Sequence, residues 1–255
     1  MVGPPRCKQL LAAPILLGMT TLLEIAAAGC SSGGEVESPP DSPPPTIAQT
    51  QAEVLAAAAV AMGTVDTVSF AIERSGAPVY IDSLDIIAFN RAEGRFAAPT
   101  SADALVTVEA AGFNTEIGAI AFEGTTWLSD PISGKFTVAP GSYAFDPVSL
   151  FDPTIGWRPL LENGLTEIEW RGLDEATGRY RFSGVADPDR LEVITAGLVR
   201  DQEVVLDLAL DSRTGTVMEV TFSTVYEGAT SDWLLTFSGY GEPVDVNPPP
   251  TSTGG

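Results

Sequence analysis

The stretch EVVLDLALDSRTGTVMEVTFSTVY, residues 203–226, decides the fold class of this 255-residue chain. Apolar and polar side chains alternate along both of its halves, and every even position from 204 to 210 is aliphatic. Alternation with a period of two is typical of a β-strand that buries one face and exposes the other to water. The four residues Ser212–Gly215 between the halves favour a tight turn. The stretch therefore predicts an antiparallel hairpin.

The same alternation continues through most of the chain between residues 67 and 237. Since most of these segments have one apolar and one polar face, we expect antiparallel strands in a sheet that is wetted on one side. Besides the hairpin at 203–211 and 216–226, the pattern predicts strands at 67–74, 79–89, 103–110, 114–122, 125–129, 167–171, 180–185 and 233–237.

Three other segments are rich in helix-forming or helix-capping residues. The expected helices are 47–62 with Thr46 as N-cap and Gly63 as its end, about 147–163 broken by Pro153 and Pro159, and 187–196 with Asp187 and Pro188 at its start. The predicted fold class is α+β: a large curved antiparallel sheet of about ten strands, a half-barrel, wrapped around a few helices.

The first thirty residues have the features of an export signal. Arg6 and Lys8 precede an apolar run at 10–23, which is too short to span a bilayer comfortably but fits a signal peptide. Small residues and then Cys30 follow, in a pattern that resembles a bacterial lipobox. We therefore expect residues 1–29 to be a lipoprotein signal peptide and Cys30 to be acylated, which would anchor the protein to the outer face of the cell membrane. The alternative is an ordinary cysteine at a signal-peptidase site.

Pro-rich segments flank the remainder of the chain. Residues 30–45 combine the acylated cysteine with a Ser, Gly and Pro tether, which favours an extended spacer. Residues 247–255 form a second segment of this kind, which we expect to be disordered. One domain at 46–246 is the simplest interpretation of what lies between them.

The composition excludes several classes of function. The chain has no histidine, two cysteines, and 34 acidic against 13 basic residues, for a net charge of −21. Histidine-dependent catalysis and imidazole metal ligands are therefore excluded. Nucleic acid is not an expected partner, because phosphate binding requires clustered basic side chains.

No catalytic motif stands out in the sequence. Carboxylate pairs such as Glu167 and Glu169 are common in so acidic a chain, and they favour a solvated strand face. Asp187 and Asp189 fit a helix cap better than a calcium loop. We therefore expect no enzyme activity, no metal and no cofactor, with a hydrolase using paired carboxylates as the weaker alternative.

Three stretches of the chain form a distinctive set: FEGTTWLSD at 122–130, FDPVSLFDPTIGWRPLLEN at 145–163 and FSGYGEPVDVNPP at 237–249. They resemble the corresponding parts of the LppX/LprA/LprF/LprG family of actinobacterial lipoproteins. The order of lipobox, Pro-rich tether, N-terminal helix, strands, helical insert and final hairpin also agrees with that family. The resemblance covers about residues 46–249.

The resemblance implies a half-barrel that encloses a large apolar cavity. It implies that the cavity binds acylated lipids or glycolipids, that the protein helps to move them across the cell envelope, and that residues 145–163 form a mobile lip. Some members act beside a major-facilitator efflux pump, so such a pump is a candidate partner. We expect a monomer. The alternative is a non-carrier envelope scaffold with a packed interior, in which the aromatic residues between 127 and 157 are core.

The candidate cavity residues are apolar side chains of three expected strands and of the helical insert at 145–163. They are Val106, Val108, Ala119, Ile120, Ala121, Phe122, Trp127, Leu150, Phe151, Ile155, Trp157, Leu160 and Leu161.

Overall fold

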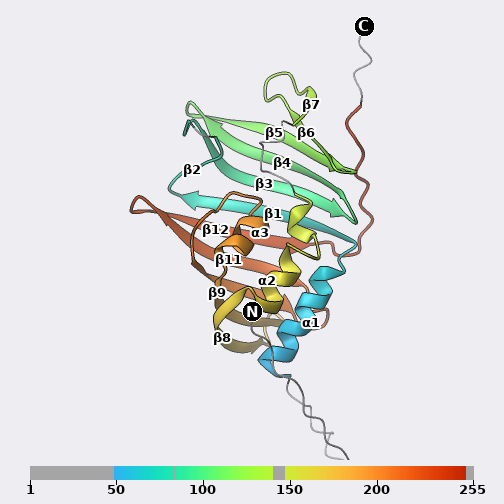
Figure 1. Ribbon diagram of the computed structural model, residues 1–255, viewed down its shortest axis with the longest axis vertical. Coiled ribbons are helices and arrows are strands. Elements are labelled where there is room, and N and C mark those ends of the chain that lie inside the picture. Colours follow the sequence, from blue (N-terminus) through green and yellow to red (C-terminus); the bar gives the residue numbers. More distant parts are fainter. Residues whose placement is uncertain (1–48, 83, 140–146, 251–255) are drawn as a thin grey trace, which may run out of the picture. The chain divides into compact units, whose positions relative to one another are not determined.

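The computed structural model describes residues 49–82, 84–139 and 147–250 (Figure 1). All of them belong to one compact unit. The predicted signal peptide, Cys30 and the whole of the tether at 30–45 lie outside the described residues, as do residues 251–255 of the expected disordered tail.

The unit is built on one sheet of twelve strands, and every strand pair is antiparallel. The order is β7-β6-β5-β4-β3-β1-β12-β11-β10-β9-β8, with β2 paired to β3, so the path is open and ends at β7 and β8. The strands are β1 (Thr67–Gly76), β2 (Val79–Tyr80), β3 (Ile87–Ala97), β4 (Ser101–Ala110), β5 (Phe113–Phe122), β6 (Thr125–Ser129), β7 (Phe136–Val138), β8 (Leu165–Asp174), β9 (Arg179–Ala186), β10 (Val204–Asp211), β11 (Val217–Tyr226) and β12 (Ala229–Ser238).

The hairpin predicted from residues 203–226 is confirmed as β10 and β11. One predicted strand is wrong, because 79–89 contains β2, a turn and the start of β3. The turn forms because the Asp82 carboxylate accepts hydrogen bonds from the backbone N–H groups of Leu84, Ile86 and Ile87, at 2.7 to 3.3 Å. The short strand β7 was not expected from the sequence.

Two-residue turns join three of the hairpins. Ala111, Glu123 and Glu227 each adopt a positive φ of about 50°, and each precedes a glycine whose φ is also positive. Two successive positive φ values define a type I′ turn, whose twist matches the twist of the flanking strands. These turns hold β4 to β5, β5 to β6 and β11 to β12.

The described residues include three α-helices and a 3₁₀ turn: α1 (Gln51–Gly63), η1 (Ser149–Phe151), α2 (Trp157–Asn163) and α3 (Pro188–Ile194). The N-cap of α1 is Thr50, not Thr46, because Thr50 and Glu53 form a reciprocal capping box. The N-cap of α3 is Asp187, as predicted, and its side chain accepts from the Arg190 N–H at 3.1 Å.

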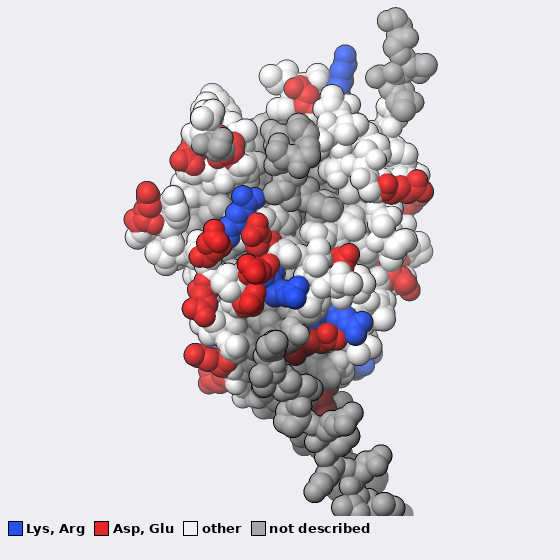
Figure 2. All heavy atoms as spheres, in the orientation of Figure 1, with Lys and Arg blue, Asp and Glu red and all other residues white. Residues whose placement is uncertain are grey.

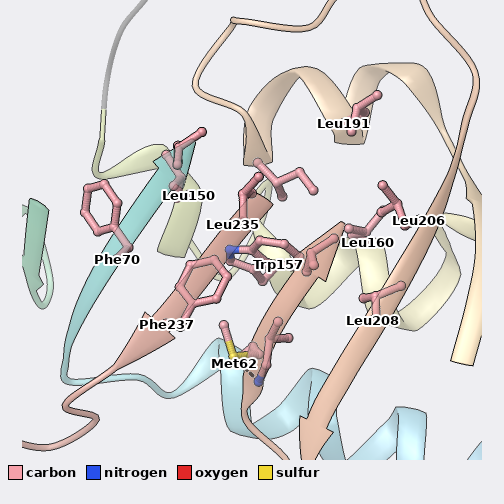
Figure 3. Close-up of a cluster of buried hydrophobic side chains, with 14 of the residues drawn as sticks. Met62, Phe70, Leu150, Trp157, Leu160, Leu191, Leu206, Leu208, Leu235 and Phe237 are labelled. Atoms are coloured by element: carbon pink, nitrogen blue, oxygen red, sulfur yellow. Dashed lines mark hydrogen bonds between the residues drawn. The ribbon is translucent and has the colours of Figure 1, made fainter. Parts of the chain in front are cut away.

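The helices lie against one face of the sheet, and the core fills the space between them (Figures 1 and 3). The ring of Phe151 packs within 6.0 Å of Phe70, Phe96 and Phe237, measured between ring centroids. Three of these rings come from the neighbouring strands β3, β1 and β12, and Phe151 comes from η1. The helical insert, residues 147–163, is therefore fixed on the sheet by aromatic contacts.

Candidate functional site: the helix-covered face of the sheet

Trp157, the first residue of α2, lies at the centre of the helix-covered face (Figure 3). Its side chain is fully buried and meets the Phe237 ring edge to face at 5.2 Å. Among the described residues, its indole Nε1 is the one buried side-chain nitrogen or oxygen without a hydrogen-bond partner. An unsatisfied buried donor costs about 1–3 kcal/mol. The interior therefore holds one polar group that a ligand acceptor could satisfy.

The turn before α2 sets the position of Trp157. The Asp152 carboxylate accepts hydrogen bonds from Thr154 and Ile155, and these bonds hold the pKa of Asp152 below its ordinary value. At Gly156 a Cβ atom would lie 2.3 Å from the Leu150 carbonyl oxygen, so only glycine allows this close approach. The backbone of the insert therefore folds back tightly on η1.

Nine of the thirteen candidate cavity residues are buried on the helix-covered side. Four of them are on β4 and β5. Directly paired residues on neighbouring strands point to the same face of a sheet, and the pairing places these four on the same face as the buried residues Phe70 and Ala92. The other five come from η1 and α2. The nine are Val106, Val108, Ala119, Ala121, Leu150, Phe151, Trp157, Leu160 and Leu161.

The remaining four candidates do not join this group. Ile120 pairs with Asp103 and Trp127, so these three side chains project from the opposite, outer face of the sheet, together with Phe122. Ile155 lies in the turn before α2 and is 41% exposed. The structure therefore does not bring these four together with Ala119 and Ala121, and their role as lipid contacts stays a prediction.

The described side chains on the helix-covered face are closely packed. Trp157, Leu150, Leu160 and Leu191 have no exposed surface, and they belong to one continuous core cluster. The nine candidates therefore occupy the space that the resemblance expects to be hollow, and an internal cavity stays a prediction.

Several residues of this face were not among the sequence candidates. They come from strands far apart in the sequence, and their own alternation over 68–72 and 233–237 was the signal that could have found them. They are Val68, Phe70, Ile72, Trp233, Leu235 and Phe237.

A shallow hollow of about 660 Å³ lies mainly on the outer face, across β1, β3, β4 and β5. Ion pairs cross it, from Arg91 to Glu73 and Glu93 and from Arg95 to Asp103. The Asp103 carboxylate raises the pKa of Arg95 above its ordinary value. These charges are paired with each other and most of them are about half exposed, so they form a solvated ion-pair network.

The described residues contain no group of three or more acidic or cysteine side chains placed to hold a metal ion. Within the same residues, no helix is long and apolar enough to cross a membrane.

Comparison with known proteins agrees with this geometry. The LppX_LprAFG lipoprotein family matches residues 50–246. The crystal structure of LprF from Mycobacterium bovis has a TM-score of 0.57 at 13% identity, and the match covers 78% of this chain and 96% of that one. The lipoprotein LppX from Mycobacterium tuberculosis has a TM-score of 0.52 at 14% identity, with coverage of 78% and 100%. No curated protein sequence matches the chain.

Proposed function

Because the chain belongs to the LppX_LprAFG lipoprotein family, we propose that it binds acylated lipids or glycolipids between its sheet and its helices and helps to move them across the cell envelope. The family match over residues 50–246 is the observation that carries this proposal. The protein would be held on the outer face of the cell membrane by acylated Cys30, and it would act without catalysis.

The chemistry of the helix-covered face supports acyl chains as ligands. The buried side chains there are almost all apolar, and each CH₂ group moved from water into such surroundings contributes roughly 0.8 kcal/mol. An ester or amide carbonyl at the head of an acyl chain is a hydrogen-bond acceptor, and the free Trp157 N–H is a donor. A ligand of this class would satisfy both the apolar surface and the donor.

Binding requires η1 and α2 to move away from the sheet, because their side chains now fill the space. The helix α2 is only seven residues long, starts without a side-chain cap and lies between Gly156 and Gly164. Short segments of this kind open at a lower free energy than the strands of a core. We therefore expect the insert to move away from the sheet when a ligand binds.

Native mass spectrometry of residues 46–249, purified from an actinobacterial host, tests the proposal. We expect a bound species with the mass of an acylated lipid or glycolipid, released by organic extraction. A protein that is consistently free of lipid from such a host would contradict the proposal. The Cys30→Ala variant of the full chain should leave the membrane fraction if acylation is the anchor.

A second candidate function is a non-carrier envelope scaffold, and the close packing of the helix-covered face favours it. Ala119→Trp separates the two, since Ala119 is buried on that face. A carrier with this substitution would lose lipid while its strands stay folded. For a scaffold, the same substitution would lower stability and change no lipid readout. A major-facilitator efflux pump is the candidate partner of the carrier, tested by cross-linking in membranes.

A further inference from the structure

Exposed apolar side chains gather at one end of the sheet. Of the fourteen large hydrophobic residues exposed in the described part of the chain, eight lie at or next to this end. We call these eight the apolar tip: Tyr80, Ile81, Leu84, Ile86, Phe113, Val205, Val225 and Tyr226.

The strand register brings the apolar tip together. Tyr80, Ile81, Leu84 and Ile86 lie within the connection 77–86 between β1 and β3. Phe113 follows the turn of the β4–β5 hairpin, and Val225 and Tyr226 precede the turn of the β11–β12 hairpin. These strands are neighbours in the order β5-β4-β3-β1-β12-β11, so the three turns stand side by side, at the left in Figure 1. Val205 joins them from β10, where the nearby Gln202 side chain accepts from the Val225 N–H.

Side-chain hydrogen bonds support the first turn of the tip. The Asp82 carboxylate binds three backbone N–H groups of the first turn. Behind that turn, Arg74 donates hydrogen bonds to the carbonyl oxygens of Phe89, Gly76 and Ala77. Leu84 and Phe113 are nevertheless 74% and 77% exposed. The turns therefore expose large apolar side chains to solvent, which is unfavourable unless another apolar surface covers them.

Aromatic residues link the tip to the core. Directly behind the turns, the ring of Trp233 stacks between Phe89 and Phe222 at centroid distances of 5.9 and 5.8 Å. Phe113 and Tyr226 lie on the same face of the sheet as these rings, the helix-covered face, because their paired residues on the neighbouring strands lie on that face. An apolar path therefore runs from the tip into the interior that the proposed function assigns to acyl chains.

The charges on the three turns are all of one sign. Residues 77–86, 111–112 and 227–228 contain Asp82, Asp85 and Glu227 and no basic residue. Acidic side chains are also seen at this end of the molecule in Figure 2. An anionic surface would be repelled at short range, so the tip suits a surface with little negative charge.

We propose that the apolar tip contacts and partly enters the lipid bilayer, at a surface of uncharged or zwitterionic lipid. The apolar residues stand on separate turns rather than on one flat patch, which a deformable lipid surface accommodates better than a rigid protein face. Tyrosines such as Tyr80 and Tyr226 are typical of the boundary between headgroups and acyl chains.

The length of the tether allows this contact. Gln49 accepts a hydrogen bond from the Tyr180 hydroxyl, so the tether joins the domain at the far end of β9 and β10. The tip is about one ten-residue strand away, roughly 33 Å. The eighteen residues between Cys30 and Gln49 can span about 60 Å. The inference rests on the proposed function here, since acylated Cys30 supplies the anchor.

The test uses the full acylated chain in phosphatidylcholine vesicles that contain lipid brominated on its acyl chains, because bromine quenches nearby indole emission. A tryptophan is added by Phe113→Trp, and in a matched control by Leu173→Trp at the opposite end of the sheet. Leu173 is 48% exposed, so neither substitution disturbs the core. We expect loss of the added emission for Phe113→Trp only. Retained emission in both variants, or equal loss in both, would overturn the inference.

Two further arms test the chemistry of the contact. In the Phe113→Trp background, Leu84→Ser should reduce partitioning into the bilayer by about tenfold, whereas Leu173→Ser at the opposite end of the sheet should not. Adding phosphatidylglycerol should reduce quenching at low salt, and salt should restore it. Quenching that rises with anionic lipid contradicts the charge argument. Capture of an envelope protein by the tip, without quenching, would identify a protein partner and overturn the inference.

Failure of the proposed bilayer contact can be distinguished from failure of the proposed lipid-carrier function. Lipid in the interior is measured by extraction and mass, whereas contact of the tip is measured by quenching. Quenching by a protein that never carries lipid would refute the carrier and leave the bilayer contact standing.

Discussion

The two fully buried tryptophans of the core offer a matched pair, because only one has a hydrogen-bond partner. Trp233 Nε1 donates to Thr224 Oγ1 at 3.0 Å, whereas Trp157 Nε1 has none. Both side chains are at most 2% exposed. We predict that Trp157→Phe changes the free energy of unfolding far less than Trp233→Phe does.

The magnitudes follow from the contacts that each substitution removes. Replacing indole by phenyl removes packed atoms at a cost of about 1–2 kcal/mol at either site. At Trp157 the substitution also removes an unsatisfied donor, and that relief of about 1–3 kcal/mol offsets the loss. At Trp233 it instead leaves the buried Thr224 hydroxyl without its donor, which adds about 1–3 kcal/mol of destabilisation. The packing loss is common to both variants, so the expected difference between them is the sum of the other two effects, about 2–6 kcal/mol.

Urea unfolding followed by far-ultraviolet circular dichroism measures both values, with the slope of the transition as a check that the unfolded states are comparable. Trp157→Phe should unfold within about 1 kcal/mol of the parent protein. Equal destabilisation by the two substitutions would refute the reasoning, because it would mean that the Trp157 N–H is satisfied in solution. The lipid content of Trp157→Phe is a second readout, and the proposed function predicts that it falls.

Three other predictions concern stability. Gly94→Ala should destabilise by about 1–3 kcal/mol in denaturant unfolding, because the new Cβ would lie 2.4 Å from both the Phe70 ring and the Asp103 carbonyl oxygen; an unchanged midpoint would contradict this close approach. Ala111→Asn should raise stability by about 0.5–1 kcal/mol, since asparagine tolerates the positive φ at this turn better; a lower melting temperature would count against the turn assignment. Hydrogen bonds from Ser133 lower the pKa of Asp130 below its ordinary value, so its contribution is present above about pH 4 and is lost as the pH falls further. The parent protein should therefore lose more stability than Asp130→Asn between about pH 5 and pH 2, and equal losses would refute the assignment.

Sequence patterning predicted the strands well, because a hairpin is a local feature. The alternation at 203–226 and the turn between its halves depend on neighbours in the sequence alone, and they became β10 and β11. The helix at 187–196 was found for the same reason, since its cap at Asp187 is local chemistry. The break within 79–89 was missed, because the apolar pattern continues through a turn that one carboxylate, Asp82, creates.

The face of β5 could not be assigned from the sequence. Ala119 and Ala121 alternate with Ile120 and Phe122, so both faces of the strand are apolar. Alternation states that two sets of side chains point in opposite directions, but it does not state which set the helices cover. The contact between Trp157 and Phe237, which are eighty positions apart, likewise depends on the strand order and not on the local sequence around either residue.

The excess of acidic residues is the feature that the family membership does not explain, and the distribution of charges on the surface suggests its consequence. On the outer face Arg91, Arg171 and Arg181 each lie beside one or two carboxylates, so they are largely neutralised within the domain. The unpaired carboxylates therefore set the long-range field, at a net charge of −21 for the chain. Such a field repels anionic headgroups until salt screens it beyond about 10 Å. If the apolar tip enters the bilayer, this repulsion makes contact with uncharged lipid the favoured event. The acidic surface would then select which membrane surface the protein contacts, while under the proposed function the apolar interior would select the lipid.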